Sequence, residues 1–274
     1  MIIGLVQTNP QDNTATNVSD AVARIRSAAE QGVHTVVLPE VFSYMGTEAG
    51  RLESAEHLGT GIFAKLAQVA KECEVNIVGG SHSERAAKKD RVFNTAVSYD
   101  NTGEVLSVYR KVHLFNLKDA EGNPLYCESN VFESGRETNF FEIKAGGEHW
   151  KCLTAICYDL RFPELFRKQI SVSGPLDIIF LPAAFTHQTG MDHWEVLLRA
   201  RAIENQCYVV ACNQTGFHSD GKKRNYGHSM VVDPWGRVVG SLNEEVGTLL
   251  CTLKKEAISE ARLRLPALAD RVFL

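Results

Sequence analysis

The chain has 274 residues, of which 44% are hydrophobic and 23% charged. This length and balance are ordinary for one large globular domain, so we expect a single domain over residues 1–274. The formal net charge of −4 is spread along the chain without a basic face or stripe. Nucleic acid is therefore not an expected partner, because a nucleic-acid binder needs such a face to neutralise phosphates.

The N-terminus and the cysteines indicate the compartment. Residues 1–7 lack the positive segment of a signal peptide and soon turn polar, which predicts a first strand. No apolar run approaches membrane-spanning length, so no contact with a membrane is expected. The seven cysteines are an odd number scattered through a long chain, as is typical of a reducing cytosol. We therefore expect a cytoplasmic protein without a disulfide framework.

In chain order, the first half of the sequence alternates between strand-like and helix-like patterns. Residues 2–7 are an apolar run, 16–31 have helical spacing, and 35–38 are apolar again, which predicts a βαβ opening. A helix and three strands are predicted next, at 62–73, 76–79, 93–99 and 105–109, with a hairpin turn at 100–103 between the last two strands. Residues 111–139 are polar and predict a long active-site loop, because structureless loops of that length are often functional.

The second half continues the alternation. The predicted strands lie at 153–156, 178–181, 208–211, 229–232 and 248–252. One predicted helix begins at Pro163, and another spans 193–205. Both parallel crossovers and hairpins occur, so the fold class is α/β with mixed sheets and helices outside them.

Three chemically versatile residues share one position in this pattern. Glu40, Lys111 and Cys157 each follow an apolar strand-like run and start a loop. The carboxyl ends of strands are where open α/β sheets assemble their sites. Taken singly, each has an ordinary structural explanation: a helix cap, a surface cation and a buried thiol.

The surroundings of Cys157 favour a catalytic role. An apolar run at 153–156 leads into it, and Pro163 begins a helix shortly after. A thiol at such a turn lies near unpaired backbone N–H groups, which favour the thiolate and bind an oxyanion. Attack on an amide also requires a base, a donor to the oxyanion and an acid for the leaving amine. A Glu, a Lys and a Cys supply all of these without histidine or metal.

Other site types lack their motifs. The sequence contains no Gly-x-Ser-x-Gly turn, no Walker A loop and no pair of ligands at the usual zinc spacing, so neither metal nor cofactor is expected. The charge run at 222–224 (Lys-Lys-Arg) predicts a solvated loop more readily than an anion site.

Three motifs resemble the signature blocks of the nitrilase-like (carbon–nitrogen hydrolase) superfamily, at 38–40, 109–114 and 156–164, and further similarity lies at 182–186, 193–195, 199–205 and 227–229. The resemblance implies a four-layer α-β-β-α sandwich of mixed sheets. It also implies Glu40 as general base, Lys111 as oxyanion partner, Cys157 as nucleophile and Glu128 as a second glutamate in the pocket. Binding of substrate is expected at Tyr158, Arg161, Phe185 and Thr186.

The resemblance is to the amidase branches, because Tyr158 and Asp159 follow the nucleophile where nitrile hydrolysers typically have Trp and Glu. The deaminated glutathione amidases are most similar and the omega-amidases next. We therefore expect hydrolysis of a primary amide of an acidic, glutamine-derived small molecule, such as deaminated glutathione, through a Cys thioester.

Other functions stay open at this point. They are omega-amidase action on 2-oxoglutaramate, hydrolysis of N-carbamoyl amino acids, and a silent binding or scaffold protein on the same fold. The resemblance also implies a homodimer or higher homo-oligomer. The Lys111–Glu128 loop is slightly longer than in the similar proteins and shapes the pocket, so it bears on which amide is bound.

Overall fold

The computed structural model describes residues 1–88, 90–219 and 221–273. Its first sheet grows from the predicted βαβ opening, with β1, β2 and β3 parallel and the remaining pairs antiparallel except β5 with β9. The strands follow the order β18-β1-β2-β3-β5-β4, with β6 and β9 also paired to β5. Their bounds are Ile2–Gln7 (β1), Thr35–Val37 (β2), Asn76–Val78 (β3), His82–Arg85 (β4), Val92–Tyr99 (β5), Val105–Arg110 (β6), Phe132–Glu133 (β9) and Gly247–Thr252 (β18).

The second sheet has the order β10-β11-β12-β13-β16-β17, in which β11, β12 and β13 are parallel. Its strands span Phe141–Ala145 (β10), Glu148–Thr154 (β11), Ile178–Ala183 (β12), Tyr208–Asn213 (β13), Met230–Val232 (β16) and Val238–Ser241 (β17). The central strand β12 is buried throughout. Ile178 and Phe180 pack between the sheets, whereas Ile179 and Leu181 pack beneath helices, which explains a continuous apolar run instead of an alternating one.

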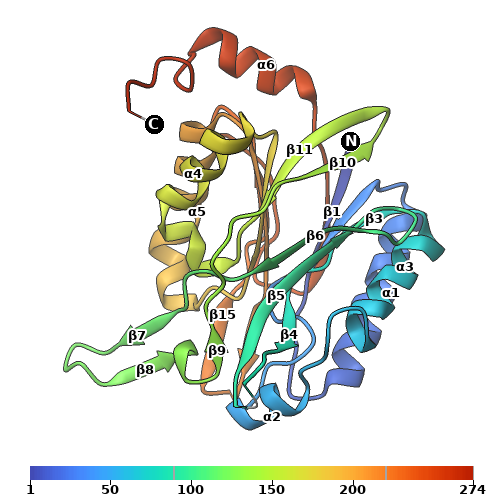
Figure 1. Ribbon diagram of the computed structural model, residues 1–274, viewed down its shortest axis with the longest axis vertical. Helices are drawn as coiled ribbons and strands as arrows, with labels where there is room; N and C mark the ends of the chain where they lie inside the picture. The colour runs from blue at the N-terminus through green and yellow to red at the C-terminus, as the bar shows by residue number, and fades with distance from the viewer. Residues whose placement is uncertain (89, 220, 274) are drawn as a thin grey trace.

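Figure 1 shows the two sheets face to face between two layers of helices. Helices α1 (Thr14–Glu30) and α3 (Gly61–Cys73) share an apolar cluster with the first sheet, and α4 (Pro163–Ser173) and α5 (His187–Asn205) share another with the second. A third cluster lies between the sheets. The predicted α-β-β-α sandwich with mixed sheets is confirmed.

The predicted loop at 111–139 is wrong in one respect, because it is not structureless. It contains a hairpin of β7 (Asn116–Lys118) and β8 (Pro124–Cys127), followed by the 3-10 helix η1 (Glu128–Asn130). The hairpin projects from the body at the lower left of Figure 1. Most of its side chains are exposed or half-buried, so no apolar alternation marks its strands in the sequence.

Several smaller elements were not predicted. They include the strands β4, β9, β10 and β17, and also α2 (Glu48–Glu53), the hairpin of β14 (Thr215–His218) and β15 (Lys223–Tyr226), the 3-10 helix η2 (Cys157–Arg161) and α6 (Lys255–Arg264). Helix α5 also begins six residues before its predicted start at 193, because its first residues are mostly polar and carry no apolar repeat. Within the described residues, no helix is both long and apolar enough to cross a membrane.

Candidate active site

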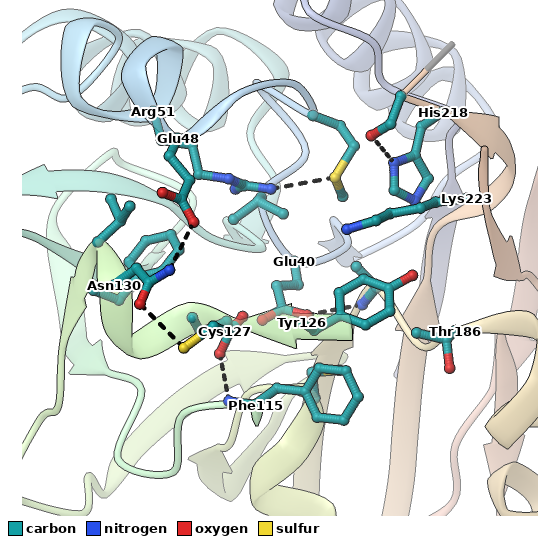
Figure 2. Close-up of a pocket in the computed structure, with 18 of the residues that line it drawn as sticks. Glu40, Glu48, Arg51, Phe115, Tyr126, Cys127, Asn130, Thr186, His218 and Lys223 are labelled. Atoms are coloured by element: carbon teal, nitrogen blue, oxygen red, sulfur yellow. Dashed lines mark hydrogen bonds between the residues drawn. The ribbon is translucent and has the colours of Figure 1, made fainter. Parts of the chain in front are cut away.

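The three strand-end residues lie together. Glu40 follows β2, Lys111 follows β6 and Cys157 follows β11, so two residues come from the first sheet and one from the second. Their exposed fractions are only 3%, 1% and 8%. All three line one cavity of about 420 Å³, and Figure 2 shows Glu40 near the centre of the residues that surround it. The strand-end pattern therefore predicted a real cluster.

Glu40 is held from three sides. Its Oε1 accepts hydrogen bonds from Asn94 Nδ2 on β5 and from Lys111 Nζ, both at 2.8 Å. Its Oε2 accepts from the backbone N–H of Ala184, just after β12, at 2.9 Å. Gln214 Nε2 donates to its backbone carbonyl at 2.6 Å. A carboxylate fixed in this way keeps its orientation while a proton moves on and off it.

Lys111 lies between two carboxylates. Its Nζ donates to Glu40 and also to both oxygens of Glu128, at 3.0 and 2.8 Å. Burial alone would lower the pKa of Lys111, but the charges of Glu128 and Glu40 outweigh it and raise that pKa above its ordinary value. Lys111 therefore stays an ammonium at neutral pH, which suits a cation facing an oxyanion and excludes it as a general base.

Glu128 joins the site from η1, as predicted, although its side chain is 22% exposed. Its Oε2 accepts from the N–H of Phe115 at 2.8 Å, and its own N–H donates to the Phe115 carbonyl at 3.1 Å. This reciprocal pair closes the base of the β7–β8 hairpin. Burial raises the pKa of Glu128; Lys111 opposes this rise and Glu40 adds to it.

Two backbone positions at the site are strained. Cys157, the first residue of η2, has φ of 45°, and Val41, directly after Glu40, has φ of 41°. Left-handed φ is uncommon for a residue with a side chain and is an outlier for a β-branched one. Such strain persists where surrounding contacts hold it, most often at functional sites.

The backbone N–H groups near Cys157 are not enough to make its thiol a thiolate. Burial and the charge of Glu40 raise the pKa of the thiol well above its ordinary value, and Lys111 and the Ala184 N–H offset this only in part. The thiol is therefore protonated at neutral pH. Because Ala184 contacts both the thiol and Glu40, the thiol has a carboxylate beside it that can take its proton.

Asp159 fixes the turn that carries Cys157. It is fully buried, and its Oδ2 accepts from Tyr109 Oη at 2.6 Å and from the N–H of Ile156 at 2.9 Å. Its Oδ1 accepts from the N–H of His113 at 3.0 Å, and His113 stacks on Phe162. This network ties the turn that carries Cys157 to the segment after β6. The sequence offered no signal for it beyond a carboxylate two residues after the cysteine.

The four residues expected to bind substrate form a side lobe next to Cys157. This lobe is lined by Tyr158, Arg161, Phe185 and Thr186. The Arg161 guanidinium lies 5.2 Å from the ring centre of Phe185 and 5.9 Å from that of Tyr158. Its Nη1 lies 3.3 Å from Nδ1 of His193. The structure therefore brings these residues together, and their contact with substrate stays a prediction.

The charge run at 222–224 separates into three environments. Lys222 is exposed. Arg224 is paired with Glu244 and lies 5.0 Å from the ring centre of Phe217. Lys223 alone lines the cavity. The solvated-loop interpretation therefore holds for only part of the run.

A Glu128→Gln substitution should lower kcat by roughly 10²-fold, since Glu128 positions Lys111 and misplacement by about 1 Å has such an effect. Glutamine has the same shape but lacks the charge that holds the ammonium. Steady-state kinetics measures this effect. Glu121→Gln, on the exposed tip of the same hairpin, is the control. A wild-type rate in Glu128→Gln would remove Glu128 from the catalytic machinery.

The described part of the chain contains no group of three or more His, Cys, Asp or Glu residues arranged to hold a metal ion.

Similar sequences are known over nearly the whole chain. The sequence profile of the carbon-nitrogen hydrolase family matches residues 2–263. The deaminated glutathione amidase of Synechocystis sp. is 37% identical over 270 residues, which cover 98% of this chain and 97% of the relative. The human deaminated glutathione amidase is 35% identical over 274 residues, which cover 98% of this chain and 82% of the relative.

Solved structures are similar as well. The Nit3 protein of Saccharomyces cerevisiae, a member of branch 10 of the nitrilase superfamily, matches with a TM-score of 0.85 and 29% identity, over 100% of this chain and 97% of that one. A CN-hydrolase superfamily protein of Xanthomonas campestris, with an arsenic adduct in its active site, matches with the same TM-score and identity over 100% and 98% of the two chains.

Proposed function

Since the chain belongs to the carbon–nitrogen hydrolase family, we propose that it is a thiol amidase that hydrolyses deaminated glutathione, with Cys157 as nucleophile. The observation that supports these roles is a buried thiol, protonated at neutral pH, beside a carboxylate and an ammonium. A thiol in that state attacks an amide only if a neighbouring base removes its proton as the bond forms.

Acylation then proceeds in two steps. Glu40 takes the proton from Cys157 as its sulfur bonds to the amide carbon, and the carbonyl electron pair moves to oxygen. Lys111 and the backbone N–H of Tyr158 stabilise this oxyanion, a contribution of ~3–4 kcal/mol per donor. When the oxyanion collapses, the C–N bond breaks and Glu40 returns the proton to the leaving nitrogen. The acyl group remains on Cys157 as a thioester.

Deacylation uses the same groups in reverse order. Glu40 removes a proton from water, and the resulting hydroxide bonds to the thioester carbon. The second oxyanion is stabilised by the same donors as the first. Its collapse breaks the C–S bond, releases the carboxylic acid and leaves sulfur to regain its proton from Glu40. One water is consumed for each amide cleaved.

The substrate is proposed from the relatives and from the pocket. The relatives from Synechocystis sp. and human are named deaminated glutathione amidase. In glutathione the γ-amide joins the glutamyl group to cysteinylglycine. This bond is a secondary amide and not the primary amide expected from the sequence, so the leaving group is a peptide amine instead of ammonia. A cavity of about 420 Å³ is within the range of ligand pockets and has room for a peptide-sized leaving group.

Comparison of three amides tests this proposal. We expect kcat/KM to be highest for deaminated glutathione, lower for 2-oxoglutaramate and lowest for an N-carbamoyl amino acid. A preference for 2-oxoglutaramate would make the protein an omega-amidase, and a preference for the carbamoyl compound would make it a carbamoyl hydrolase. Absence of turnover with all three would favour a binding or scaffold role.

We also propose a homodimer or higher homo-oligomer that works in the cytoplasm, with residues 1–274 as one domain. The exposed apolar side chains of α5, at Met191, Val196 and Ile203, support association. The seven cysteines, all free, support a reducing compartment. Light scattering of the purified protein tests the first proposal and cell fractionation the second.

A further inference from the structure

The cavity carries a second charged region on the walls above Glu40. Arg51, on α2, and Lys223, on β15, both line it. Figure 2 shows their charged ends extending toward one another from opposite walls, with Tyr126 below Lys223. The sequence predicted neither α2 nor a role for Arg51. The two cations come from segments that only the fold brings together.

Arg51 is held by soft and apolar groups. Its Nη2 lies 3.3 Å from the sulfur of Met45, and its guanidinium carbon lies 5.7 Å from the ring centre of Phe132. Within residues 1–88, 90–219 and 221–273, no carboxylate oxygen lies within ion-pair distance of Arg51 or Lys223. Burial lowers the pKa of Arg51, with Glu128 and Glu40 opposing this, as expected for a guanidinium withdrawn from water.

Lys223 completes the pair. Its Nζ lies 4.0 Å from the ring centre of Tyr126, and burial together with Arg51 lowers its pKa. His218 lies in the same wall, and burial, Lys223 and Arg51 lower its pKa to about 4, so it is neutral at pH 7. Glu48 is a carboxylate near both cations, and its Oε1 accepts from Asn130 Nδ2 at 3.2 Å. Two facing cations repel one another, and an anion between them would relieve that repulsion.

We infer that Arg51 and Lys223 form a subsite for the terminal carboxylate of the substrate's leaving group, an inference that rests on the proposed amidase function. Deaminated glutathione has one carboxylate on its acyl part and one on its glycine. The acyl part stays bonded to Cys157, next to the side lobe with Arg161. The pocket beside Arg161 has a volume of only about 20 Å³, too small for cysteinylglycine, so we place the leaving group in the cavity of about 420 Å³, whose walls carry Arg51 and Lys223.

A substrate pair tests the subsite. We compare deaminated glutathione with an analogue in which a carboxamide replaces the glycine carboxylate. Hydrogen bonds between charged groups predict that the wild type prefers the acid by roughly 10- to 100-fold in kcat/KM, mainly through KM. Arg51→Met and Lys223→Met should each reduce this preference markedly. Lys222→Met, at the exposed neighbour, should retain the wild-type preference.

Binding separates the subsite from the chemistry. Calorimetric titration of the Cys157→Ala protein with the acid and with the carboxamide should give the same preference in Kd, and adding Arg51→Met should reduce it. This measurement reads the subsite even if the wild type hydrolyses neither compound, an outcome that would overturn only the proposed function. Equal binding of the acid and the carboxamide would overturn the subsite.

The acyl end provides the remaining check. 2-Oxoglutaramate carries the acyl carboxylate but no carboxylate on its leaving group. Arg51→Met and Lys223→Met could lower kcat/KM for 2-oxoglutaramate as much as for deaminated glutathione. The cations would then act on the acyl end or on the catalytic groups, and the assignment would be overturned. A loss confined to the substrate with the glycine carboxylate supports it.

Discussion

A Cys157→Ala substitution is expected to abolish turnover, with a loss on the order of 10⁴-fold or more, as when the nucleophile of a covalent hydrolase is removed. Without sulfur no thioester forms, and Glu40 and Lys111 are left to polarise an amide with no attacking atom. Mass spectrometry of enzyme with a slowly turned-over substrate should find the acyl group on Cys157 in the wild type and no acyl adduct in the variant.

The controls for this variant address fold and specificity. Alanine differs from cysteine only by the small buried sulfur, so the thermal unfolding curve should remain cooperative. Cys73→Ala, on α3 and outside the cavity, is the matched cysteine control and should retain wild-type turnover. Substantial amide hydrolysis by Cys157→Ala would contradict the proposed mechanism, in which Cys157 carries the acyl group as a thioester.

The cluster of Glu40, Lys111 and Cys157 was predictable because its signal is local. An apolar run followed directly by a chemically active residue marks the end of a buried strand, and parallel neighbours bring such ends together. Glu40 and Cys157 each follow a strand of a parallel set, β2 and β11. Apolar periodicity also predicted mixed sheets with helices outside them, whereas the four-layer α-β-β-α sandwich was implied by the resemblance to the nitrilase-like superfamily.

The rest depends on contacts between distant segments. Asp159 accepts from Tyr109 fifty residues away, and neither residue differs locally from an ordinary polar surface side chain. Arg51 lines the pocket from α2, a six-residue helix without a buried face. The sequence of this helix therefore has no apolar repeat from which the helix could be predicted. Lys223 and Lys222 are adjacent in the sequence, yet only Lys223 lines the cavity. The pairing of β15 with β14 decides which of the two side chains faces the cavity, and the local sequence does not indicate it.

The thiol illustrates a further limit. The sequence around Cys157 predicted backbone donors that favour a thiolate, but it reports only on groups within a few residues of the thiol. The dominant influences are burial and the charge of Glu40, which is 117 positions away along the chain. A pKa depends on the dielectric surroundings and on every nearby charge, so it follows only from the assembled fold.

Lys111→Met should abolish activity and also destabilise the fold, by about 3–5 kcal/mol at neutral pH, because removing one partner of a buried ion pair leaves charge uncompensated. In this case two carboxylates, Glu40 and Glu128, lose their common cation. Methionine fills a similar volume, so the loss of stability measures the removal of the charge and not the creation of a cavity. Chemical denaturation of both proteins at several pH values measures it, with Lys168→Met on the exposed face of α4 as control.

The pH dependence distinguishes electrostatics from packing. In the wild type the pKa of Lys111 is raised, so its stabilising charge is present below the unfolded value near ~10.4 and is lost only as pH rises through the folded value. It therefore stays constant between about pH 5 and 8. The pKa of Glu128 is already raised, and it rises further without Lys111, so the folded variant binds protons more tightly than the unfolded chain. Its stability must fall as pH rises, and the deficit against wild type should be largest near pH 8 and shrink toward pH 5. A deficit that is the same at both pH values would mean that Lys111 stabilises the fold by packing and not by its charge.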